Sequence, residues 1–250
     1  MTEADVLSID LPWKATTRHR TAVAFRDGDT IAVVPIAGTD IDLVAFVIET
    51  AAPGALVLID APLDGCDSLA PGENFRRVDR KLSGAGIPIL PSSKAGDRGP
   101  RLRSQILALR DDLEIRESYP YAVLRVLWAV QESGENFDFH GDASIDLSPH
   151  WKTYPPRYKR ERSASACREA IEKVAETVAR VPHFGTAVPS VGALRGGALK
   201  QAVDEIDALI GLVAAIARAD ESAWHWCARC DEGEGSIETI ADGGLRRRFE

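Results

Sequence analysis

Two aspartates near the start of one apolar helix are the first candidates for chemistry in this chain. Asp204 and Asp207 lie three residues apart in the stretch Val203 to Ala217, where apolar side chains recur at helical spacing, so the two acids share a face. A helix this apolar is expected to be buried on most sides, where an unpaired carboxylate is costly. The acids could cap the helix, because negative charge near a helix N-terminus gains about 0.3–1 kcal/mol. They could instead hold a divalent cation that faces a cleft.

Further acids lie within or at the ends of predicted strands. Asp10 lies in the apolar run Val6 to Leu11, Asp60 lies near the end of the run Ala55 to Ala61, and Glu117 lies near the end of an alternating run. Phosphodiester hydrolysis by two metal ions needs three or four carboxylates that converge from different elements. We therefore predict that a catalytic site binds Mg²⁺ or Mn²⁺ through Asp10, Asp60, Asp204 and Asp207, with Glu117 as an outer member. The alternative for each strand acid taken separately is a turn or cap acid.

Basic side chains are the candidates for contacts with a phosphate. Arg76 and Arg80 belong to the segment Leu63 to Asp112, which is rich in Gly, Pro, Ser and Arg. This segment could be a lid that faces phosphates, or a solvated charged surface. Lys159 and Arg160 lie in a basic and aromatic turn. They could contact a scissile phosphate, steady Glu117, or be solvated.

A pair of cysteines invites comparison with zinc sites. Cys227 and Cys230 form a C-x-x-C with His225 nearby, but a second pair of ligands is missing from the sequence. Free thiols are the alternative. No phosphate-binding glycine loop, dinucleotide fingerprint, nucleophile elbow or H-E-x-x-H motif is present, so the enzyme classes that carry those motifs lose their usual signatures.

Composition limits the function classes further. The 250 residues carry a formal net charge of −8 with a sequence pI of about 5.3, which argues against a protein that coats nucleic acid through bulk charge. This net charge does not exclude a nuclease, since a metal site is itself acidic. Four cysteines are too few for a disulfide scaffold, and neither a secretory signal nor a membrane span is predicted. We therefore expect a cytoplasmic protein.

The predicted elements follow an order that brings the acids together. Two β-rich runs, Thr21 to Arg26 and Thr30 to Pro35, flank an Asp-Gly-Asp turn and form a hairpin that follows the first strand. The later elements are a helix at 41–48, a strand at 55–61, helices at 75–82 and 101–113, a strand at 113–118, and helices at 121–130, 163–180 and 203–217. Residues 132–151 are not assigned. This is the element order of the ribonuclease H-like fold.

Several short motifs carry a more specific resemblance. They are SIDL, LVLIDAPL, the R-x-x-D-R of Arg76 to Arg80, RESYP, YKRER, DEIDAL and the tail Gly235 to Ile237. In this order, across nearly the whole chain, they resemble the DUF429 family of predicted ribonuclease H-like nucleases. The helix around Asp207 also resembles the closing helix of Holliday-junction resolvases.

The resemblance implies both a fold and an activity. The fold is α/β: one domain over residues 1–250 with a mixed five-stranded sheet, order 3-2-1-4-5, flanked by helices and carrying a helical and loop insertion at roughly 63–112. In that order Asp10 and Asp60 lie side by side. One departure is Leu11-Pro12-Trp13 after Asp10, where many members have small residues. Trp13 could pack or stack on a base.

Three functional hypotheses follow. The first is a metal-dependent nuclease that hydrolyses phosphodiester bonds in RNA or DNA. The alternative is a non-catalytic ribonuclease H-like module that binds a nucleic acid or a protein partner, which the low pI and the Pro12-Trp13 pair favour. In a third hypothesis the acids act on a small phosphorylated molecule.

Overall fold

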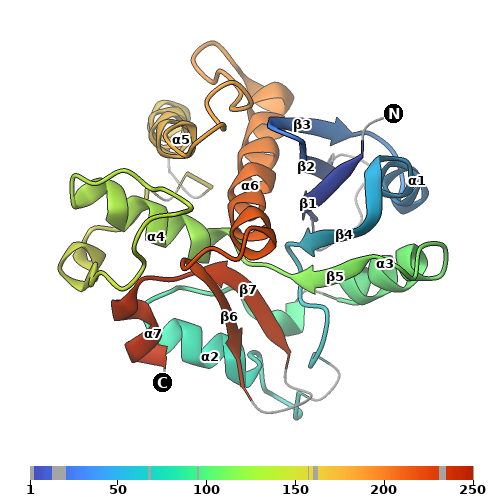
Figure 1. The fold of residues 1–250 in the computed structure, drawn as a ribbon, viewed down its shortest axis with the longest axis horizontal. Coiled ribbons are helices and arrows are strands. Elements are labelled where there is room, and N and C mark those ends of the chain that lie inside the picture. Colours follow the sequence, from blue (N-terminus) through green and yellow to red (C-terminus); the bar gives the residue numbers. More distant parts are fainter. Residues whose placement is uncertain are drawn as a thin grey trace.

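A mixed five-stranded sheet forms the centre of the protein (Figure 1). The computed structural model describes residues 3–12, 21–66, 69–94, 96–156, 158–159, 163–230 and 235–249. The strands are β1 (Ala4–Asp10), β2 (Thr21–Asp27), β3 (Thr30–Ile36), β4 (Ala51–Ile59) and β5 (Glu114–Glu117), in the spatial order β3-β2-β1-β4-β5. β1, β2 and β3 pair antiparallel, whereas β4 is parallel to both β1 and β5. The predicted mixed sheet and its strand order are therefore confirmed.

Local chemistry explains the hairpin and the sheet edge. Gly28, in the turn between β2 and β3, has a φ of 58°, a left-handed conformation that glycine adopts without steric cost. Pro35 lies in β3, which is an edge strand, so its missing N–H removes no hydrogen bond from the interior of the sheet.

Helices cover both faces of the sheet. Figure 1 shows α1 (Asp40–Thr50) and α3 (Arg98–Leu107) on one side, and α4 (Pro120–Glu132), α5 (Ala164–Ala179) and α6 (Gly196–Ala219) on the other. Because side chains alternate along a strand, each strand contributes to two cores. Val6 and Leu58 belong to the core beneath α6, whereas Leu7 and Val57 belong to the core beneath α1 and α3.

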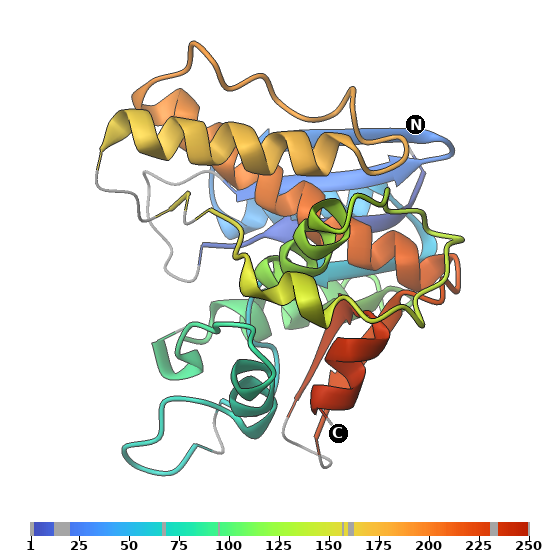
Figure 2. The same ribbon diagram turned by 90° about the vertical axis from the view of Figure 1, so that its left-hand side faces the viewer.

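The helix α6 is the central element of the helical side. It packs most extensively on β1 and β2 and is itself covered by α4 and α5, as Figure 2 shows for α5. This double coverage explains why every residue from Val203 to Ala217 except Glu205 is buried. The helix begins at Gly196, well before the predicted start at Val203.

Residues 63–112 contain α2 (Arg77–Gly84), the short helix η1 (Ser92–Lys94) and α3. The prediction that α3 extends to Leu113 is wrong: it ends at Leu107, and Leu109 is 66% exposed. The helix stops there because the chain turns before it enters β5. In this turn the Arg110 carbonyl accepts a hydrogen bond from the Leu113 amide.

The C-terminal tail forms structure that the sequence pattern did not reveal. β6 (His225–Arg229) and β7 (Ser236–Ile240) form an antiparallel pair, and α7 (Gly243–Phe249) follows. Together with α2, these elements lie below the sheet in Figures 1 and 2, and the short helix η2 (Ser148–Lys152) contacts α4. In the described part of the chain, no helix has the length and apolar character needed to cross a bilayer.

Candidate functional site

The pairing of β1 with β4 places Asp10 and Asp60 at the same end of the sheet. Ile9 pairs with Ile59, and the Asp60 amide donates a hydrogen bond of 2.9 Å to the Ile9 carbonyl. Strand alternation gives Asp10 the same face as Ser8, and Asp60 the same face as Leu58, which is the face that α6 covers. The two acids therefore approach one another from neighbouring parallel strands.

The packing of α6 on β1 adds Asp207 to this pair. Gly211 lies against Ser8, and a Cβ on Gly211 would come 2.2 Å from Ser8 Oγ. Asp207 precedes Gly211 by four residues, about 6 Å along a helix. Asp10 follows Ser8 by two residues, about 7 Å along a strand. Because these two distances are similar, Asp207 lies near Asp10. Asp207 is 1% exposed, and Asp204, one helical turn nearer the start of α6, is 9% exposed.

One loop supplies a partner to each oxygen of Asp207. The Tyr158 hydroxyl donates to Asp207 Oδ1 at 2.5 Å, and Lys159 Nζ forms an ion pair with Asp207 Oδ2. Lys159 therefore contacts Asp207 and does not pair with Glu117, although its side chain is 53% exposed and within reach of solvent. Arg160, predicted beside it, lies outside the described residues.

The gathered acids perturb one another. Burial raises the pKa of Asp60 to about 7, opposed by Lys159 and reinforced by the charges of Asp207 and Glu117. Burial likewise raises the pKa of Asp204 to about 6, with Asp207 adding to the effect. The pKa of Asp10 is also raised well above its ordinary value, mainly by burial and then, against the effect of Lys159, by the negative charges of Asp207, Asp60 and Asp204.

The charge of Lys159 responds to the same cluster. Desolvation of its ammonium lowers the pKa of Lys159, but the charge of Asp207, followed by those of Asp10 and Asp60, raises it well above its ordinary value. Lys159 therefore carries its positive charge at neutral pH and offsets part of the negative charge of the four aspartates.

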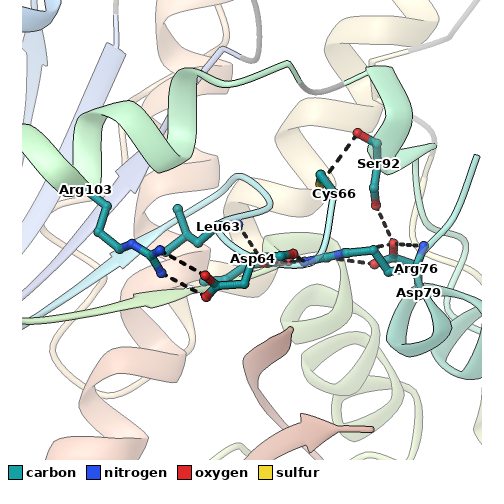
Figure 3. A network of polar contacts seen from close by, with 8 residues as sticks. Leu63, Asp64, Cys66, Arg76, Asp79, Ser92 and Arg103 are labelled. Carbon is teal, nitrogen blue, oxygen red and sulfur yellow. Dashed lines mark hydrogen bonds and ion pairs between the residues drawn. The ribbon is translucent and has the colours of Figure 1, made fainter. Parts of the chain in front are cut away.

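Glu117 belongs to a different group of side chains. It lies two residues after Ile115 and so shares the face of β5 that packs in the opposite core, and its Oε2 accepts from the Leu63 amide at 2.9 Å. Arg76 donates to both Glu117 oxygens, at 2.7 and 2.5 Å. It also donates to Asp79, as Figure 3 shows. Because Arg76 already makes these bonds, Glu117 is held by an arginine and lies outside the group formed by the four aspartates.

Arginines that were predicted to contact a phosphate are instead bonded to acids and carbonyl groups of the protein. Arg76 is 3% exposed, and its guanidinium binds Asp79, Glu117 and the Asp64 carbonyl, so it has no exposed fork to offer a substrate. Arg80 is half-exposed and bonds Glu73 and the Phe75 carbonyl. Other basic residues of the 63–112 segment pair with acids in the same way: Arg98 and Arg101 with Asp40, and Arg103 with Asp64. These pairings offset much of the positive charge on which the prediction of a phosphate-facing lid was based.

A shallow pocket lies between the four aspartates and this network. It encloses about 250 Å³ of space open to solvent. Asp60, Glu117, Ser118 and Tyr119 contribute polar walls, and Ile89, Leu90 and Ile237 contribute apolar ones. The pocket makes Asp60 the aspartate that a molecule bound there would meet first.

The four aspartates suit a hard divalent cation by their donor chemistry. Carboxylate oxygens are the ligands that Mg²⁺ and Mn²⁺ favour, and the charges of neighbouring aspartates add to burial in raising the pKa values of Asp10, Asp60 and Asp204. Among the described residues, however, no three acidic, histidine or cysteine side chains are arranged as a set that could hold a metal ion. The fit is thus one of donor type and charge.

The cysteines do not form a metal site in the described ranges. Neither Cys227 nor Cys230 is in a disulfide, and His225 Nε2 bonds Glu238 at 2.7 Å.

Two residues that matter at the site escaped prediction from the sequence. Tyr158 was available in the YKRER motif, one position before Lys159, but nothing in the pattern showed that its hydroxyl would reach Asp207. Asp79 lies three residues after Arg76, and this spacing within a helix was a usable signal for an ion pair.

Comparison of the chain with protein-family models, with curated proteins and with solved structures gives no match in any of the three.

Proposed function

We propose that this protein is a metal-dependent nuclease that hydrolyses phosphodiester bonds in RNA or DNA at the site formed by Asp10, Asp60, Asp204 and Asp207. The single observation behind the proposal is that β1, the end of β4 and α6 bring these aspartates near enough for the charge of Asp207 to add to burial in raising the pKa values of Asp10, Asp60 and Asp204. Such an arrangement is costly for stability, and a cation at the site would offset the cost. Mg²⁺ or Mn²⁺, when bound there, would activate water and polarise a phosphoryl oxygen.

The chain's own residues have separable roles in this proposal. Asp10 and Asp60, on adjacent strands, and Asp204, on the outer turn of α6, would supply oxygen ligands together with Asp207. Lys159 is exposed enough for its ammonium to approach a phosphate oxygen. The pocket beside Asp60 would receive the part of the substrate next to the scissile bond.

The decisive experiment is cleavage of labelled RNA and DNA by the purified chain with Mn²⁺ or Mg²⁺. The variant Asp60→Asn should abolish cleavage while its far-ultraviolet circular dichroism stays unchanged. Asp29→Asn is the matched control, because it removes the same charge from the turn between β2 and β3, at the opposite end of the sheet. Cleavage that survives Asp60→Asn, or persists in excess chelator, contradicts the proposal.

A second candidate is a non-catalytic module that binds a nucleic acid or a protein partner. The observation that favours it is the ion pair between Lys159 and Asp207, which already neutralises part of the cluster. Absence of Mn²⁺ binding in calorimetry, together with retained binding to an oligonucleotide, would decide for this candidate.

A further inference from the structure

We propose that Lys159 is the built-in counter-ion of the four-aspartate site, and that its ammonium and a divalent cation are alternative occupants of that site. The inference rests on the proposed function, because it concerns the same four aspartates, and it adds a residue that controls how tightly the cation binds.

The first support is the position of the ammonium. Lys159 Nζ pairs with Asp207, the most buried of the four aspartates, and it also interacts electrostatically with Asp10, Asp60 and Asp204. A single positive charge that interacts with all four carboxylates already offsets part of the negative charge that a second cation would otherwise meet.

The second support is that Asp207 is held in place independently of Lys159. The Tyr158 hydroxyl bonds Asp207 Oδ1, whereas Lys159 binds Oδ2. Departure of the ammonium would therefore release one oxygen of Asp207 and leave the other bonded.

The third support is that the ammonium can leave at low cost. The side chain of Lys159 is 53% exposed, so it can rotate into water without opening the protein. Arg76 is the contrasting case, because its side chain is 2% exposed and its planar fork bonds two carboxylates. Of Lys159 and Arg76, Lys159 is therefore the one that can exchange with another cation.

The charge balance explains why the two occupants exclude one another. A divalent cation favours the ionised forms of Asp10, Asp60 and Asp204, whose pKa values burial raises, and four ionised carboxylates with one ammonium would carry an excess of negative charge that attracts it. An ammonium and a divalent cation within the same cluster repel each other at short range. A divalent cation therefore binds with the loss of the Lys159 pair, and Lys159 weakens its binding.

Titration calorimetry with MnCl₂ tests this directly on the wild type and on the variants Lys159→Met and Lys159→Arg. Lys159→Met should bind Mn²⁺ about tenfold more tightly or better, since a competing charge is gone. Lys159→Arg keeps the charge and should stay close to the wild type. Lys152→Met removes an exposed lysine of η2 and is the matched control, expected to leave binding unchanged.

Thermal unfolding gives a readout that needs no bound metal. In chelator, Lys159→Met should melt at a lower temperature than the wild type, because four aspartates lose their counter-ion, and Mn²⁺ should raise its melting temperature more than that of the wild type. Lys152→Met should melt like the wild type under both conditions.

The outcomes separate this inference from the proposed function. If the wild type binds Mn²⁺, Asp60→Asn removes that binding, and Lys159→Met binds no more tightly, the competition is wrong while the metal site stands. If neither the wild type nor Lys159→Met binds Mn²⁺, both ideas fail. Binding by Lys159→Met alone supports the competition.

Discussion

Gly211 of α6 lies so close to Ser8 of β1 that a Cβ on the glycine would come 2.2 Å from Ser8 Oγ. This contact lets the backbone of the helix approach the strand, and it sets the register in which Asp207 faces Asp10. A contact between two small residues in the core thereby determines where two carboxylates meet.

Gly211→Ala should destabilise the protein by about 1–3 kcal/mol, because the added methyl group has to push Ser8 or the helix out of place. The expected change is a lower urea midpoint at unchanged slope. Gly197→Ala is the control in the same helix: nothing lies within 4 Å of its Cβ, and it should stabilise by about 0.4–1 kcal/mol. In a Ser8→Ala background the penalty of Gly211→Ala should shrink, and an undiminished penalty would show that this contact is not its cause.

Arg76→Met should cost about 3–5 kcal/mol of unfolding free energy, since it leaves Glu117 and Asp79 buried without their positive partner. Arg80→Met, on the same helix, removes an ion pair whose side chains are 51% and 43% exposed and should cost about 0–1 kcal/mol. Chemical denaturation of both variants measures the difference. Equal losses of unfolding free energy for the two variants would mean that the buried ion pairs of Arg76 stabilise the protein no more than the exposed ion pair of Arg80.

Tyr158→Phe should destabilise by about 1.5–3 kcal/mol, because Oδ1 of the buried Asp207 loses its donor. Tyr154→Phe is the control: Tyr154 is 52% exposed, and its ring keeps the stacking with Arg125 when the hydroxyl is removed. Urea denaturation in chelator measures both variants without a contribution from bound metal. If Tyr158→Phe is as stable as Tyr154→Phe, the hydroxyl does not support Asp207.

Asp60→Asn should change how stability depends on pH. The pKa of Asp60 rises from an ordinary value of 3.8 to about 7, so the folded protein holds this proton more tightly than the unfolded chain. The stability that protonated Asp60 contributes is present below pH 3.8 and is lost as the pH rises through about 7. The variant lacks this loss, and in chelator its stability relative to the wild type should increase from pH 4 to pH 7 and then level off. A constant difference across that range would show that Asp60 titrates normally.

The apolar patterning of the sequence was enough to predict most strands of the sheet, whereas their spatial order was expected from the likeness of the element order to a known fold. Val6 to Leu11, Thr21 to Pro35 and Ala55 to Ala61 carry their strand signals locally, through β-branched residues and an Asp-Gly turn, and strand alternation follows from them. The meeting of Asp10 with Asp60 could therefore be expected once β1 and β4 were placed side by side.

The pairing of charged side chains at the site depends on contacts between segments that are far apart in the sequence. Local spacing shows that Glu117 ends a strand, but only the folded chain shows that Arg76, 41 positions away, takes both of its oxygens. In the same way, the basic turn was visible in the sequence, while the pairing of Lys159 with Asp207 depends on how α6 packs against β1. Residue types and periodicity determine which side chains can carry charge and which elements form, because those are local properties. Which charges neutralise one another depends on tertiary packing, because ion pairs join segments that the sequence keeps apart.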